Sequence, residues 1–75
     1  MADLIFTRHA RNEMRRRGLS ETLVVRVVED PDSFYDRVDG CTEYLAEVDG
    51  RTFEVVVAEG SPRRVVTAYE RKGAR

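Results

Sequence analysis

The chain has 75 residues, a formal net charge of −1 and 36% charged residues, a composition that fits a single small globular domain spanning residues 1–75. A chain of this length buries only roughly 60% of the surface its unfolded form exposes, so its stability margin is narrow. The single cysteine, Cys41, excludes an internal disulfide, and one histidine with one cysteine cannot form a zinc site of ordinary spacing. We therefore expect no metal and no cofactor, although a metal held by carboxylates stays open.

The charges are segregated along the chain. Residues 8–17 hold five arginines against one glutamate, a net charge of +4, and residues 62–75 also carry +4, while residues 18–61 carry −8. This segregation fits a nucleic-acid or acidic partner, but solvated helices often show it without any partner. No apolar run approaches the roughly 20 residues of a membrane span, and no signal-peptide pattern opens the chain. We expect a cytoplasmic protein that makes no membrane contact.

Two helices are predicted first. Thr7 is a suitable N-cap for a helix over about residues 7–17, and Gly18 supplies the left-handed conformation that ends it. Ser20 is a suitable N-cap for a second helix over about residues 20–29, which ends before the proline that follows it. The valines of this second segment favour helix poorly, so a strand is the alternative there.

From Ser33 onward the apolar residues alternate with period two, which predicts strands over about residues 33–38, 42–48, 51–58 and 63–70. Asp49-Gly50 is a two-residue hairpin signal, and such a turn pairs Val48 with Arg51 and places Ala46 opposite Phe53. This register sends the apolar residues to one face and Glu43, Glu47 and Glu54 to the other. In the last strand, either Val66 and Ala68 or Val65, Thr67 and Tyr69 face the helices, and the sequence leaves both open.

These elements predict an α+β fold in which two N-terminal helices pack on one face of a three- to four-stranded antiparallel meander. The other sheet face is expected to be partly polar and open to water or to a partner.

The first predicted helix contains a histidine beside charged groups. His9, Glu13 and Arg16 fall within roughly 60° of one another on the flank of the apolar stripe. A histidine next to a carboxylate and a guanidinium can act as a general acid or base. The alternative is structural, because Glu13 precedes Arg17 by four residues in the favourable orientation for a helix ion pair.

The end of the chain mixes basic groups with one aromatic ring. The residues are Arg63, Arg64, Thr67, Tyr69, Arg71 and Lys72. RNA-binding proteins use this mixture, since guanidinium groups neutralise phosphates and a tyrosine stacks on a base. A charged edge strand that resists aggregation, followed by a solvated tail, explains the same residues equally well.

The stretch from Thr7 to Ser20, which reads TRHARNEMRRRGLS, resembles the opening of a group of short bacterial domains of unknown function. That opening has a His-Ala pair, a Met five residues after the His, and then Arg-Gly-Ile/Leu-Ser. The Glu29-Asp30-Pro31 segment and the Thr67-x-Tyr69 strand also fit this group. The group is similar to RelE-type and BrnT-type toxins of the barnase-like ribonuclease superfamily.

This resemblance implies a RelE/barnase-like fold, an RNA substrate cleaved without metal, and a cognate antitoxin as partner. It implies catalytic roles for His9 and Tyr69, RNA phosphate binding by Arg16, Arg17, Arg63 and Arg64, and supporting roles for Glu13 and Thr67. The chain departs from the group at Glu13, where many members carry arginine. A carboxylate next to His9 raises the proton affinity of the imidazole and weakens local phosphate binding.

Three hypotheses follow. The first is a metal-independent endoribonuclease or RNA-binding toxin, which predicts that His9 and Tyr69 share a cleft with arginines. The second is a non-catalytic module that binds protein or RNA through its open sheet face, with His9 packed against the second helix. The third is a domain whose sequence encodes only its fold. The oligomeric state, the identity of the RNA and the need for a ribosome are not readable from the sequence.

Overall fold

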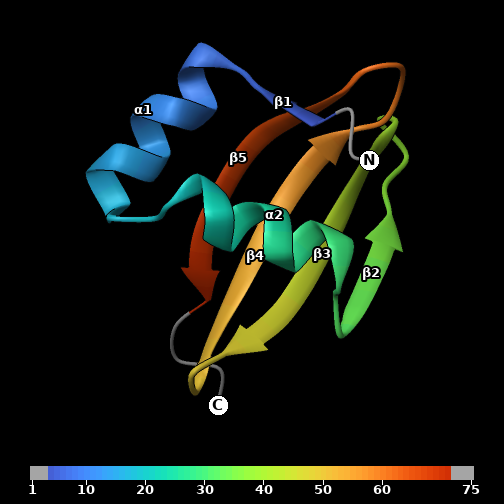
Figure 1. The fold of residues 1–75 in the computed structure, drawn as a ribbon. Helices are drawn as coiled ribbons and strands as arrows, with labels where there is room; N and C mark the ends of the chain where they lie inside the picture. The colour runs from blue at the N-terminus through green and yellow to red at the C-terminus, as the bar shows by residue number, and fades with distance from the viewer. Residues whose placement is uncertain (1–3, 72–75) are drawn as a thin grey trace.

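Five strands of the computed structural model, which describes residues 4–71, form one mixed sheet, and two helices lie on one of its faces (Figure 1). The spatial order of the strands is β1-β5-β4-β3-β2. In chain order the elements are β1 (Leu4–Phe6), α1 (Arg8–Arg17), α2 (Glu21–Glu29), β2 (Ser33–Asp36), β3 (Cys41–Val48), β4 (Arg51–Ala58) and β5 (Arg63–Arg71).

The sheet differs from the predicted one by a strand at its edge. β2 to β5 form an antiparallel meander, but β1 adds to β5 in parallel, with Leu4 opposite Arg63 and Phe6 opposite Val65. The prediction of three or four antiparallel strands was therefore incomplete. A three-residue strand is too short to show a period, and its partner lies almost sixty residues further along the chain, so no local pattern reports the pairing.

Both helices begin at side-chain caps, and α1 ends at a glycine. The Thr7 hydroxyl accepts a hydrogen bond from the Ala10 amide at 3.0 Å, and the Ser20 hydroxyl accepts one from the Leu23 amide at 3.1 Å. Gly18 has φ 73° and its N–H donates to carbonyl oxygens of the last turn of α1. Only a left-handed residue can end a helix in this way without strain, which is why glycine stands there.

The β3–β4 hairpin has the register that its turn predicts. Asp49 and Gly50 both have positive φ, 55° and 80°, as a tight hairpin turn of this type requires. Val48 pairs with Arg51, and Ala46 pairs with Phe53. Turn chemistry and hydrophobic alternation therefore select the same pairing.

A bulge between β4 and β5 resolves the register of the last strand. Val57 pairs with Val65 and Val56 pairs with Thr67, so Val66 is an extra residue on β5. Because of this extra residue, Val65 and Ala68 both face the helices and both are buried. Neither of the two regular alternations considered for this strand is the observed one.

The core lies between the helices and the sheet. It is formed by the apolar stripe of each helix and by the helix-facing residues of the three central strands: Ala10, Met14, Leu19, Val24, Val27, Val28, Ala46, Phe53, Val55, Val57, Val65 and Ala68. Within residues 4–71, neither helix is long and apolar enough to cross a membrane.

Candidate functional site

The sheet face opposite the helices, called the open face here, carries a carboxyl group that is almost completely buried. No helix covers this face in Figure 1. Glu54 lies at its centre, paired with Tyr69 on β5 and with Leu45 on β3. These cross-strand neighbours lie directly beside the glutamate, and its exposed fraction is only 4%. A buried acid on an uncovered sheet face needs partners, because burial disfavours its charged form.

The partners of Glu54 come from the two neighbouring strands. Burial raises the pKa of Glu54, and a hydrogen bond and charge from Glu43 raise it further. A hydrogen bond from the Tyr69 hydroxyl and the charge of Arg71, whose guanidinium lies 3.4 Å from the carboxylate, act in the opposite direction. Burial likewise raises the pKa of Tyr69, and the hydrogen bond of its hydroxyl to Glu54 raises it further. The phenol therefore stays protonated and can donate a hydrogen bond.

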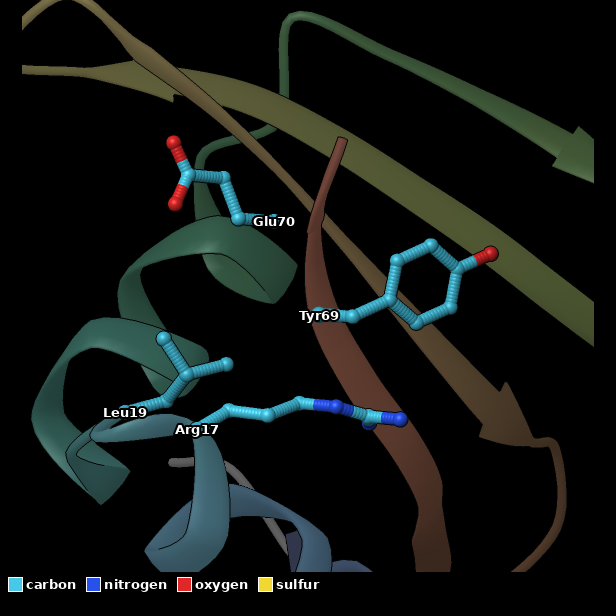
Figure 2. Close-up of a pocket in the computed structure, with 4 residues that line it drawn as sticks. All are labelled: Arg17, Leu19, Tyr69 and Glu70. Carbon is cyan, nitrogen blue, oxygen red and sulfur yellow. The ribbon is translucent and has the colours of Figure 1, made fainter. Parts of the chain in front are cut away.

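The ring of Tyr69 forms part of a pocket at the edge of the sheet (Figure 2). The pocket has a volume of about 260 Å³ and is lined by Arg17, Leu19, Tyr69 and Glu70. Arg17 extends from the end of α1 toward β5, and its guanidinium carbon lies 5.9 Å from the centroid of the Tyr69 ring. This distance is within the range of a cation–π contact.

Arg17 occupies a gap that the sheet leaves open. β1 pairs with residues 63–65 of β5, so within the described residues the rest of β5 has no strand neighbour on that side. The Arg17 guanidinium donates to the Ala68 carbonyl oxygen at 3.0 Å and lies 2.8 Å from the Glu13 carboxylate. It thus satisfies an edge carbonyl and joins α1 to the Tyr69 side of the sheet.

The exposed surface of α1 is basic. It presents Arg8, Arg11, Arg15 and Arg16 to solvent. Arg11 pairs with Glu21 of α2, and Arg16 pairs with Glu13 at 2.7 Å. Such exposed pairs are weak and exchange readily for other anions. The surface that adjoins the Arg17–Tyr69 pocket is therefore available to a polyanion.

The predicted site residues are only partly brought together. Arg17, Tyr69, Glu13 and Thr67 lie in one neighbourhood, with the Thr67 hydroxyl 3.5 Å from the Arg17 guanidinium. His9 is exposed, and it makes no hydrogen bond or ion pair within residues 4–71. It lies in the first turn of α1, eight positions before Arg17, which is about 12 Å along the helix axis. His9 does not line the pocket, and its side chain is exposed rather than buried in the core.

The two arginines predicted to bind phosphate from β5 have different surroundings. Arg63 donates to the Tyr44 hydroxyl at 2.9 Å and to the Glu59 carboxylate at 3.2 Å, so it is part of a structural network. Burial alone would raise the pKa of Glu59, but hydrogen bonds from the Thr42 and Tyr44 hydroxyls and the nearby Arg63 outweigh it, and the pKa is lowered. Arg64 is exposed, pairs with Ile5 and Ala58, and faces the open face.

Glu54 and Glu43 were not among the predicted site residues, and Arg71 was predicted only as part of the basic and aromatic end of the chain. A signal for the two acids was present, because the Asp49-Gly50 register places them on the open face. Glu43 pairs with Val56 and Glu54 pairs with Leu45. These two pairs are consecutive on the same face of the sheet, so the two acids are diagonal neighbours across β3 and β4. The position of Arg71 depends on the bulge in β5, which no sequence pattern reports. Within the described residues, no group of three or more histidine, cysteine or acidic side chains is arranged to hold a metal ion.

Comparison with known proteins gives one family. Neither the comparison with curated proteins nor that with solved structures gave a match. The family model described as "Domain of unknown function (DUF4258)" matches residues 6–70, which span α1, α2, four strands and nearly all of the residues described above. The chain therefore belongs to the family of domains of unknown function DUF4258.

Proposed function

We propose that this domain binds single-stranded RNA at the Arg17–Tyr69 pocket and cleaves it without a metal cofactor, as a RelE-like toxin of a bacterial toxin–antitoxin class acting in the cytoplasm. The observation that carries the proposal is the position of the Arg17 guanidinium, 5.9 Å from the Tyr69 ring at the open edge of β5. Single-stranded RNA is bound by this combination, because a splayed base stacks on the aromatic ring and its phosphate pairs with the cation.

The surroundings of the pocket support binding of a polyanion. The exposed arginines of α1 continue the positive surface away from Arg17 along the helix. Arg64 and Arg71 add positive charge at the two ends of β5, on either side of Tyr69. A strand of RNA following this surface neutralises its phosphates over several successive contacts, so its affinity depends steeply on salt.

The cleavage step draws on groups next to the pocket. A carboxylate of the Glu43–Glu54 pair removes the proton of a 2′-hydroxyl, and the resulting oxygen attacks the neighbouring phosphorus. Arginine stabilises the charged phosphorane, and the Tyr69 hydroxyl protonates the 5′-oxygen as its bond to phosphorus breaks. The products are a 2′,3′-cyclic phosphate and a 5′-hydroxyl end. The carboxyl pair adjoins Tyr69, whereas His9 lies about 12 Å from Arg17 along α1.

Binding is tested by fluorescence anisotropy with a labelled single-stranded RNA of mixed sequence, titrated at several salt concentrations. Arg17→Gln and Tyr69→Leu are expected to weaken binding about five- to tenfold, and Arg17→Gln to reduce the salt slope by about 0.7. Arg26→Gln is the matched control, since it removes an exposed helical arginine of α2. Equal affinities and equal salt slopes for Arg17→Gln and the wild type, with both proteins folded, would show that this pocket does not bind RNA.

Cleavage is tested with end-labelled RNA in the presence of EDTA, and in growing cells by primer extension after induction. Loss of cleavage in Glu43→Gln, Glu54→Gln and Tyr69→Phe, with binding retained, assigns the chemistry to the open face. Loss in His9→Ala alone assigns it to α1 instead. Growth arrest that disappears when a neighbouring small gene product is co-expressed identifies the antitoxin.

A non-catalytic binding module is the second candidate function. The observation that favours it is the burial of Glu54, because a carboxyl group with 4% exposure is difficult for a 2′-hydroxyl to reach. This function predicts RNA binding with the salt dependence given above and no new RNA ends in any of the assays.

A further inference from the structure

The apolar groups that the domain leaves exposed are concentrated on one edge strand. The large hydrophobic residues exposed in the described chain are Ile5, Phe34, Tyr35 and Val38, and three of these lie within the five-residue segment 34–38. Phe34 is 59% exposed and Tyr35 is 57% exposed, on opposite faces of β2. A domain with a small core gains stability by burying such rings, so their exposure marks a contact surface.

The backbone of β2 is open on the side away from β3. β2 ends the spatial order of the sheet and lies at its outer edge in Figure 1. The Arg37 amide donates to the Cys41 carbonyl at 2.8 Å, which fixes the alternation of hydrogen-bonding residues along the strand. Tyr35, two residues before Arg37, also directs its backbone N–H and C=O groups to β3. Phe34 and Asp36 therefore direct their N–H and C=O groups to the open edge.

The negative charge at this edge favours a basic partner. Residues 29–43 contain six acids and one arginine, a net charge of −5. That arginine, Arg37, is already shared between Asp39 and Glu43, at 3.0 and 3.7 Å. A second copy of this chain paired through β2 would bring two such acidic edges together. RNA would meet the same repulsion and cannot form a backbone ladder.

We propose that the open edge of β2 binds an extended, basic segment of a partner protein, which adds to the sheet as a sixth strand. Its backbone pairs with Phe34 and Asp36, its apolar residues cover Phe34 and Tyr35, and its lysines or arginines lie opposite Asp36 and Asp39. This site is at the opposite edge of the sheet from the Arg17–Tyr69 pocket, so it does not depend on the RNA proposal.

The probe is an array of short synthetic peptides in which two β-branched residues alternate with two lysines, in all four phases, because Phe34 and Tyr35 are adjacent apolar residues followed by Asp36. A matched set carries glutamate in place of lysine. Binding to the full chain is measured by anisotropy, and the contact is mapped by NMR amide exchange. At least one lysine peptide is expected to bind saturably and to slow exchange of the Phe34 and Asp36 amides. The glutamate peptides are expected not to bind.

Asp36→Pro removes an outward-facing N–H without removing a backbone hydrogen bond to β3, and it is expected to weaken peptide binding about tenfold. It also removes the Asp36 carboxylate, which accepts a hydrogen bond from the Thr42 hydroxyl at 3.4 Å. Asp36→Asn is the matched control that retains the N–H and loses only the charge, and its loss of affinity is expected to be smaller and to vanish at high salt. Thermal unfolding confirms that both variants fold.

Three results of the binding and exchange experiments overturn the proposal. They are failure of every lysine peptide to bind, equal binding by Asp36→Pro and the wild type, and protection by RNA of the Phe34 and Asp36 amides. Sedimentation of the chain alone is expected to give a monomer. A dimer that Asp36→Pro dissociates would make a second copy the occupant and would also overturn the proposal.

Discussion

The Arg17 guanidinium lies between the Glu13 carboxylate and the Ala68 carbonyl, at 2.8 and 3.0 Å, with the ring of Tyr69 beside it. One side chain therefore ends α1, caps a carbonyl at the free edge of β5 and lines the pocket of the proposed RNA site. A residue with these three contacts has a stability role as well as a binding role, and the two can be separated by experiment.

Arg17→Ala is expected to lower the free energy of unfolding by about 1–2 kcal/mol, because it removes a charged hydrogen bond to the Ala68 carbonyl at the open edge of β5. Arg16→Ala is the matched comparison. Within residues 4–71 the polar contacts of Arg16 are with the shared Glu13, and its side chain is 71% exposed, so we expect a loss of less than about 0.5 kcal/mol. Urea unfolding followed by circular dichroism measures both. Equal losses would mean that the Ala68 contact does not stabilise the fold.

Thr7 joins two elements through one hydroxyl group. It accepts from the Ala10 amide at 3.0 Å and donates to the Val65 carbonyl at 3.1 Å, so it caps α1 and connects it to β5. Thr7→Val keeps the shape and removes both bonds, with an expected cost of about 2–3 kcal/mol in urea unfolding. Thr7→Ser keeps the hydroxyl and is expected to cost much less. A valine variant as stable as the serine variant would refute this role.

Met14 attaches α1 to the core, since its side chain is 3% exposed. Met14→Ala is expected to cost about 2–5 kcal/mol, because it loses buried apolar surface and leaves a cavity. Met14→Leu conserves volume and is expected to cost less than about 1.5 kcal/mol. Thermal unfolding of the two variants beside the wild type checks the difference, and similar melting temperatures for Ala and Leu would show that α1 is loosely packed.

The parts of the fold that local signals encode were predictable. The caps at Thr7 and Ser20 and the Asp49-Gly50 turn act over a few residues, and each has the geometry its residue types favour. The parts that were missed depend on distant segments. β1 is defined by a partner strand at the other end of the chain, and the β5 bulge is defined by how that strand meets β4.

The candidate site divides in the same way. Arg17 and Tyr69 were predicted separately, from a helix motif and a strand motif, but their contact required the placement of α1 on β5. The acids of the open face were visible in the hairpin register, yet the burial of Glu54 needed the neighbouring Tyr69, which the sequence left on either face. His9 has the residue type expected of an acid–base group, and its catalytic role stays a prediction.

Glu54 makes the stability of the domain depend on pH in a direction that can be measured. Burial of Glu54 and the nearby carboxylate of Glu43 raise the pKa of Glu54 in the folded state above the value of about 4.3 expected in the unfolded chain. Between those two values the folded state binds more protons, so wild-type stability falls as pH rises from below the unfolded pKa through the folded pKa.

Glu54→Gln keeps the size of the side chain and an acceptor for the Tyr69 hydroxyl, and it removes this titration. The melting temperature of the variant relative to the wild type is therefore expected to be higher at pH 7.5 than at pH 4. Loss of the half-exposed Arg71 ion pair offsets this by about 0–1 kcal/mol at most. Glu47→Gln, which makes the same substitution at an exposed acid on β3, is the matched control. A relative melting temperature that falls between pH 4 and pH 7.5 would mean that the charged form of Glu54 is the one the fold stabilises, and that Arg71 and Tyr69 outweigh burial and Glu43.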